Sequence, residues 1–257
     1  MLLPRVMPCL LVSRGRLVKT VRFRQPRYVG DPVNAIKIYN EKEVDELVLL
    51  DIDAARSGES PNYGLVRMVA DECFMPLSYG GGIRSAEQIE RLLAIGVEKV
   101  VLNTLPATDP REVSRAAARF GTQCIVGSID VDRGLLGRHV LRRTGGEIEV
   151  RGDLPEYVRR VEEMGAGEIL VNDVNRDGTW KGFDLAMLSK VSSRAKVPVI
   201  ACGGAGSVDD IGRAVNTGGA SAVAIGSMAV YQGKDLGVLV NFPSRAALLD
   251  AFSRQSR

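Results

Sequence analysis

The sequence predicts a single (β/α)8 barrel over residues 1–257, built from two half-barrel repeats at about 1–120 and 121–257. Short apolar runs alternate with amphipathic segments along the whole chain, as expected for parallel strands joined by helices. The glycine-rich turns at Gly82 and Gly204 lie 122 residues apart, close to half the chain length. A doubly wound open sheet is the alternative, but such sheets seldom repeat at half-length with both turns kept.

Eight strands are expected, enough for one complete barrel. They lie at 5–12, 45–53, 75–80, 98–103, 123–130, 167–174, 197–202 and 221–226. Helices are expected to begin at Pro32 and Pro110, because each follows an aspartate that suits the N-cap position. Ser85–Gln88 has the pattern of a capping box, and Ser207–Asp210 repeats it with Asp at the last position.

Composition excludes several classes of protein. The 34 basic and 31 acidic side chains leave a net charge of only +3, which gives no general attraction to nucleic acid or membranes. No apolar stretch reaches the ~18 residues that span a bilayer, no signal-peptide pattern is present, and the four cysteines form no CxxC pair. We therefore expect a soluble cytoplasmic protein with buried free thiols. The only histidine, His139, lies in a polar stretch, so we expect neither a metal site nor a cofactor.

Two glycine-rich turns are candidates for binding phosphate. Each follows a strand and precedes a capped helix, where backbone N–H groups favour an anion. One such turn is weak evidence, because turns need glycine for steric reasons alone. Two at equivalent places favour a phosphorylated small molecule whose other end is a second phosphate or another polar group. The residues are Gly81, Gly82, Asn103 and Thr104 in the first half, and Gly203, Gly204, Gly226 and Ser227 in the second.

A carboxylate at a strand end is the candidate catalytic group. Asp130 ends its strand, whereas the matching strand of the first half carries Leu11 where a second carboxylate would complete an acid/base pair. Further polar residues at strand ends are Asp51, Asp53, Asn175 and Asp177. The turn at 175–179 either orients substrate, through Asp177 or Thr179, or is a structural Asx-type turn.

Charged residues mark both ends of the expected barrel. Residues 13–30 carry six basic side chains, Lys19 among them, and we expect a loop that closes as a lid over a phosphorylated ligand rather than only a solvated basic face. The starts of four strands carry Arg5, Glu46, Lys99 and Glu168. These four residues either form ordinary ion pairs on the surface or form a ring around the opening at the bottom of the barrel.

Together these features resemble one family, the cyclase subunit of imidazole glycerol phosphate synthase, over essentially the whole chain. The matching segments include 5–10, 30–32, 45–47, 80–85, 120–124, 163–169, 176–179 and 203–206. The resemblance implies a glutaminase partner, bound as a heterodimer at the amino-terminal face of the barrel. It implies an ammonia gate at Arg5, Glu46, Lys99 and Glu168, and binding of phosphate and substrate by residues that include Lys19, Asp177 and Gly178. It also implies catalytic aspartates at positions 11 and 130.

The chain departs from that family pattern at Leu11 and Asn175, which stand where the family has aspartate, and at Tyr79, where the family has a small aliphatic residue. Loss of a general acid/base group lowers a rate by about 10²–10⁴-fold. Segments 8–11 and 17–23, with 34–46, resemble instead a divergent branch that accompanies surface-polysaccharide genes. That branch works with a glutaminase-like partner and a separate sugar amidotransferase.

Three functions follow from the resemblance. The first is an ammonia-channelling subunit for amidination of a nucleotide sugar in O-antigen or lipopolysaccharide synthesis. The second is a cyclase of histidine biosynthesis, a lyase, in which Asp130 works alone or Asp51 or Asp177 substitutes for the missing partner. The third is a non-catalytic scaffold that only activates the glutaminase. The related isomerase of the histidine pathway is more distant, since the charges at the bottom face count against it.

Overall fold

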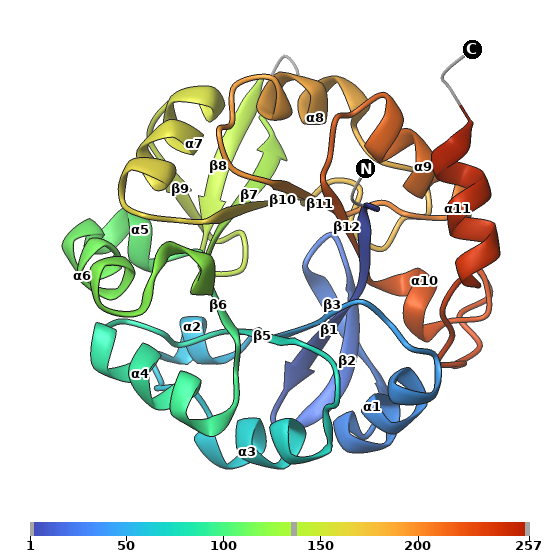
Figure 1. Ribbon diagram of the computed structural model, residues 1–257, viewed down its shortest axis with the longest axis horizontal. Coiled ribbons are helices and arrows are strands. Elements are labelled where there is room, and N and C mark those ends of the chain that lie inside the picture. The colour runs from blue at the N-terminus through green and yellow to red at the C-terminus, as the bar shows by residue number, and fades with distance from the viewer. Residues whose placement is uncertain (1–2, 135–137, 255–257) are drawn as a thin grey trace.

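The computed structural model describes residues 3–134 and 138–254, and it confirms the predicted barrel (Figure 1). Eight parallel strands each pair with the next, and the last pairs with the first, so the sheet closes. In order they are β1 (Arg5–Ser13), β4 (Leu47–Asp51), β5 (Leu77–Gly80), β6 (Lys99–Leu102), β7 (Ile125–Arg133), β10 (Glu168–Asp173), β11 (Val199–Cys202) and β12 (Ala222–Ile225). All eight predicted strands are present, although most are shorter than predicted.

Helices cover the outside of the barrel (Figure 1). They are α1 (Pro32–Glu41), α2 (Ala54–Ser57), α3 (Tyr63–Glu72), α4 (Ala86–Ile95), α5 (Leu105–Thr108), α6 (Pro110–Phe120), α7 (Leu154–Glu163), α8 (Leu185–Ser192), α9 (Val208–Asn216), α10 (Ser227–Val230) and α11 (Arg245–Ser253). In the described part of the chain, none of them has the length and apolar character needed to cross a membrane. A 3-10 turn at Thr122–Cys124 precedes β7, which therefore starts later than predicted and runs past Asp130.

The predicted capping boxes form in both halves. The Ser85 hydroxyl accepts a hydrogen bond from the Gln88 amide at 3.4 Å, and the Ser207 hydroxyl accepts one from the Asp210 amide at 3.2 Å. In each case the side chain at the third helical position accepts in return from the amide just before the serine. Asp109 makes no capping bond to α6, contrary to the prediction, because it also ends α5 and its backbone geometry is set there.

A β-hairpin replaces the loop expected at residues 13–30. Strands β2 (Arg16–Val21) and β3 (Arg24–Gly30) pair in antiparallel fashion, and β2 also pairs with the end of β1. The two residues at the tip, Arg22 and Phe23, both have positive φ, as a tight hairpin turn requires. The Leu, Val and Thr side chains of β2 favour a strand, and the prediction gave more weight to the basic residues among them.

A second hairpin extends the sheet after β7. It consists of β8 (His139–Arg143) and β9 (Ile148–Val150), which follow β7 in antiparallel order. His139 therefore lies in a strand, half-buried, and not in the solvated loop that the sequence predicted. The turn between the two strands, residues 144–147, becomes part of the site described below.

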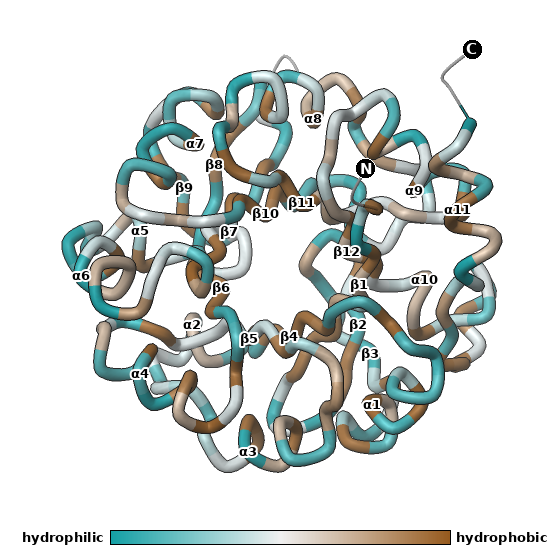
Figure 2. The backbone as a smooth tube through the Cα atoms, in the orientation of Figure 1, coloured by the Kyte–Doolittle hydropathy of each residue, from teal (hydrophilic) through white to brown (hydrophobic). Residues whose placement is uncertain are grey.

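The core has two layers. The larger layer lies between the strands and the helices. The smaller layer fills the inside of the barrel, and Figure 2 shows the hydrophobic stretches of the strands around this centre. It consists of Met7, Cys9, Val48, Val101, Val126, Leu170, Ile200, Cys202, Ala222 and Ala224. The middle of the barrel interior is therefore apolar. Of the four free cysteines, Cys73 is half-buried rather than buried as expected.

Candidate active site

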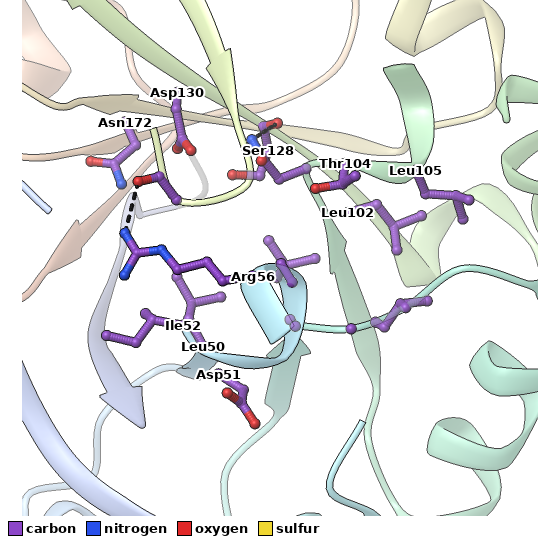
Figure 3. A pocket seen from close by; sticks show the side chains of 18 of the residues that line it. Leu50, Asp51, Ile52, Arg56, Leu102, Thr104, Leu105, Ser128, Asp130 and Asn172 are labelled. Carbon is purple, nitrogen blue, oxygen red and sulfur yellow. Dashed lines mark hydrogen bonds between the residues drawn. The ribbon is translucent and has the colours of Figure 1, made fainter. Parts of the chain in front are cut away.

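A cavity of about 400 Å³ opens at the carboxyl ends of the barrel strands (Figure 3). This is the end at which barrels of this architecture place their active sites. The cavity brings together the predicted catalytic position, its missing partner and the first glycine-rich turn. The predicted residues that line it are Leu11, Asp51, Gly81, Gly82, Asn103, Thr104 and Asp130.

Asp130 is the most perturbed acid of the cavity. It is buried, with 6% of its surface exposed. Burial raises the pKa of Asp130 to about 7, and the nearby negative charge of Asp177 adds to the shift. A carboxyl group that titrates near neutral pH is suited to accept or donate a proton.

The first glycine-rich turn packs tightly against the end of β4. Gly81 has φ +128°, and a Cβ there would lie 2.5 Å from the Asp51 carbonyl oxygen. Gly203 makes the equivalent contact in the second half, where a Cβ would lie 2.6 Å from the Asp173 carbonyl oxygen. These glycines thus have a steric role in both halves, whatever they bind.

Asn103 and Thr104 lie beside this turn, but their side chains already have partners. The Asn103 amide donates to the Ser128 carbonyl at 3.1 Å and accepts from the Thr144 amide at 3.1 Å. The Thr104 and Thr144 hydroxyls lie 3.5 Å apart. The two predicted phosphate ligands thus hold the turn of the β8–β9 hairpin at the edge of the cavity.

The second predicted anion site is organised differently. Lys19 lies 2.7 Å from an oxygen of Asp177, and the Thr20 hydroxyl donates to the other oxygen at 3.2 Å. Lys19 and Asp177 are both buried, and a Cβ on Gly226 would lie 2.9 Å from Cε of Lys19. The other residues predicted for this site are Gly178, Gly203, Gly204 and Ser227. Neither they nor Lys19, Asp177 and Gly226 line the 400 Å³ cavity.

Three segments meet at the rim of the cavity. Arg56 of α2 donates to the Gly145 carbonyl at 3.1 Å, drawn in Figure 3, and pairs with Glu147 at 2.9 Å. The ring of Phe23, at the tip of the β2–β3 hairpin, lies 3.2 Å from the position of a Cβ on Gly146. Sequence reasoning missed these contacts, because the hairpins that make them were predicted as loops.

The remaining polar residues at strand ends have structural roles. Asp51 accepts hydrogen bonds from the amides of Asp53 and Ala54, at 3.0 and 3.1 Å. Asp173 lies 122 residues later. It accepts hydrogen bonds in the same way, from the backbone amides of Asn175 and Arg176. The Asn175 side chain accepts from the Arg133 amide at 2.7 Å, so it fastens the turn to β7. The bonds of Asp51 and Asp173 form Asx-type turns. The turn at 175–179, for which the sequence offered that interpretation, is held instead by Thr179, whose hydroxyl donates to the Arg176 carbonyl at 2.7 Å.

Four charged residues close the opposite end of the barrel, and we call them the charged ring. Arg5 pairs with Glu46 at 2.6 Å and with Glu168 at 2.8 Å, and Lys99 pairs with the same carboxylates at 2.9 and 3.3 Å. Cations and carboxylates therefore alternate around the ring. The structure brings these four residues together, and their role in passing ammonia stays a prediction.

Two residues that sequence reasoning missed complete the cavity wall. Ser128 and Asn172 both line the cavity, and the Oδ1 atom of Asn172 is buried without a hydrogen-bond partner among the described residues. Asn172 follows Leu50 by 122 residues, so the internal repeat contained the signal that marks it as a cavity position. Within the described residues, no cluster of His, Cys, Asp or Glu side chains is arranged to hold a metal ion.

Comparison with known proteins identifies the family. Residues 5–235 match the family model described as histidine biosynthesis protein. A Pseudomonas aeruginosa protein named "Putative imidazole glycerol phosphate synthase subunit hisF2" is 49% identical over 239 residues, which cover 93% of this chain and 95% of that one. Its counterpart hisF3 from Vibrio vulnificus is 46% identical, covering 95% of this chain and 94% of its own. Another from Leptospira interrogans, named HisF, is 45% identical, covering 95% and 97%. The chain therefore belongs to the histidine biosynthesis protein family and, within it, to the HisF type.

Proposed function

We propose that this chain is the barrel subunit of a glutamine-dependent complex, and that it carries ammonia from a glutaminase partner through the barrel to the cavity. One observation carries the proposal: the charged ring closes one end of an apolar barrel interior whose other end leads to the cavity. Neutral ammonia enters such an interior far more readily than ammonium, because burying an unpaired charge is costly. The glutaminase would bind at the face that contains the charged ring.

We further propose that the nitrogen serves to amidinate a nucleotide sugar in O-antigen or lipopolysaccharide synthesis, with a separate sugar amidotransferase. Leu11 supports this, since the cavity wall opposite Asp130 has no carboxylate at that position to complete the family's acid/base pair. Asp51 lines the same cavity, but one of its oxygens already accepts two backbone hydrogen bonds.

The second candidate is the cyclase reaction of histidine biosynthesis, in which the bis-phosphate ribonucleotide and ammonia give imidazole glycerol phosphate and an aminoimidazole carboxamide ribonucleotide. The raised pKa of Asp130 favours it, because that carboxyl group remains available for proton transfer. The names of the relatives also point to this enzyme.

Turnover separates the two candidates. The purified chain is incubated with ammonium and the bis-phosphate ribonucleotide, and product formation is compared with that of Leu11→Asp. We expect no turnover by the natural chain at ordinary enzymatic rates of about 1–10³ per second, and a gain in the variant. Turnover at an ordinary rate by the natural chain would establish the cyclase instead.

Passage of ammonia is tested in the complex with the glutaminase. Lys99→Glu should reduce transfer of nitrogen from glutamine and leave the use of added ammonium unchanged, because only the first route crosses the charged ring. Lys190→Glu is the matched control, since Lys190 is exposed and lies 3.9 Å from its nearest carboxylate. Unchanged transfer in Lys99→Glu would support the third function, a scaffold that only activates the glutaminase.

A further inference from the structure

The turn of the β8–β9 hairpin is joined to α2 across the rim of the cavity. Gly145 of this turn and Arg56 of α2 both line the cavity, and the Arg56 guanidinium donates to the Gly145 carbonyl at 3.1 Å (Figure 3). The hairpin follows β7 and α2 follows β4, and β5 and β6 lie between these two strands in the barrel. The bond therefore bridges three strand spacings, about 14 Å along the sheet.

The inner end of this turn is firmly held. Thr144 is buried, and its backbone N–H donates to the Asn103 side chain at 3.1 Å. Its φ is +57°, which β-branched residues rarely adopt, and Gly145 and Gly146 continue in the left-handed region. A strained backbone persists only where its surroundings hold it, and such strain gathers at segments that switch conformation. Thr144 is thus a fixed point beyond which the turn can move.

The outer end of the turn is held by contacts at the surface. Glu147 pairs with Nε of Arg56 at 2.9 Å, but the two side chains are 56% and 32% exposed. Exposed ion pairs contribute little to stability and are screened by salt. The ring of Phe23 adds a van der Waals contact against Gly146. The contacts of residues 145–147 can therefore break without disturbing the core.

The β2–β3 hairpin, which the sequence marked as the lid, is held more firmly. Lys19 and Asp177 form its buried ion pair at 2.7 Å, and the Arg22 amide donates to the Asp177 carbonyl at 2.9 Å. Movement that separates a buried pair leaves uncompensated charges, so it is strongly disfavoured. The segment of the rim that can move most easily is therefore the β8–β9 turn.

We infer that residues 145–147 form a movable cover of the cavity, with its hinge at Thr144 and its latch at Arg56. With the latch closed the cover shields the cavity from solvent, and with the latch open it admits a small molecule. The inference deepens the proposed function and rests on it in taking the cavity as the place where ammonia arrives. A closed cover keeps that ammonia from escaping into solvent.

A thiol placed in the cavity reports on the cover. Ser128 lines the cavity and is 8% exposed, so Ser128→Cys should react with iodoacetamide when the cover opens. Mass spectrometry of the full chain after digestion identifies the labelled position. Adding Arg56→Gln should raise the labelling rate about twofold to fivefold, as loss of one exposed ion pair allows. Added salt should raise the rate with the natural Arg56 and not in the variant.

Gly145→Ala tests the latch by a second route. A Cβ there would lie 2.8 Å from Nη2 of Arg56 and displace the guanidinium, so labelling should rise as in Arg56→Gln. Arg159→Gln removes an exposed ion pair on α7 and is the matched control. It should leave the labelling rate unchanged.

The inference is overturned if Arg56→Gln and Gly145→Ala leave the labelling of Ser128→Cys unchanged, or if Arg159→Gln raises it as much. A parallel rise at Cys124, which is buried outside the cavity, would show loosening of the whole chain and would also overturn it. The labelling needs neither glutaminase nor ammonia, so failure of the cover and failure of ammonia passage appear in separate assays.

Discussion

Asp130 is a carboxyl group whose burial couples the stability of the barrel to pH. Its pKa is raised from 3.8 to about 7 in the folded chain, so the folded state binds more protons than the unfolded state between these two values. The free energy of unfolding should therefore fall as pH rises from about 4 to 7 and level off above that. Each pKa unit corresponds to about 1.36 kcal/mol, so the effect is of the order of a few kcal/mol.

Urea unfolding at pH 4, 5.5 and 7.5 measures this effect, with Asp130→Asn as the comparison. The difference in stability between the two chains should change with pH in the direction given above. Equal pH dependence in both chains would show that other acids dominate. Asp177 is the charge that acts on Asp130, Arg142 of β8 is paired with it in the sheet, and Asp51, Arg56, Arg84 and Asp109 line the same cavity.

Gly81 is a residue that no other amino acid can replace without a steric clash. Its φ of +128° and the 2.5 Å approach to the Asp51 carbonyl leave no room for a Cβ. Gly81→Ala should lower the free energy of unfolding by about 2–4 kcal/mol through backbone strain and the steric clash. Gly233→Ala serves as control, because nothing lies within 4 Å of a Cβ there. Similar urea midpoints for the two variants would contradict the expectation.

The β2–β3 hairpin is an element fastened by one buried ion pair. Lys19→Met leaves Asp177 buried without its cation, which should cost about 3–5 kcal/mol. Hydrogen exchange should also rise along β2 and β3, where the pair holds the hairpin to the turn after β10. In Lys37→Met the lost partner is exposed and 3.6 Å away, so stability should change by less than about 1 kcal/mol. Unchanged exchange in Lys19→Met would mean that backbone pairing alone holds the hairpin.

Elements with a strong local pattern could be predicted, and those that depend on tertiary contacts could not. The eight barrel strands and the capped starts of α4 and α9 follow from apolar runs and capping residues. The β2–β3 hairpin was not predicted because a third of its residues, five of the fifteen in Arg16–Gly30, are basic. The burial of Lys19 depends on Asp177, which is 158 residues away. No local pattern records such a partner.

At the scale of the whole molecule, the charged ring joins the two halves of the chain at the starts of the barrel strands. Three of the four residues come from the first half of the chain, and Glu168 joins them from the second. Glu168→Gln leaves two cations facing one carboxylate, so we expect a loss of about 1–3 kcal/mol in urea unfolding. Glu163→Gln, at an exposed pair, is the control. A loss of the same size in both variants would mean that the charged ring stabilises the fold no more than an exposed ion pair does.

At this scale the sequence predicted the closed barrel and brought Leu11, Asp130 and the first glycine-rich turn to one end. The sequence could not predict that Lys19 forms an ion pair with Asp177. Nor could it predict that the Oδ1 atom of Asn172 is buried without a hydrogen-bond donor among the described residues. Both depend on distances between distant segments. The repeat offset of 122 residues is a sequence feature that relates distant segments, because it makes Leu50 and Asn172 equivalent positions in the two halves.

The unlike pairs of the cavity have a consequence for how a ligand can sit in it. A barrel of two like halves would accept a molecule with two similar ends in either of two orientations, related by half a turn about the barrel axis. Leu11 with Leu50 on one side and Asp130 with Asn172 on the other remove this degeneracy. A ligand with one apolar side and one polar side would therefore fit the cavity in one of these two orientations and not in the other.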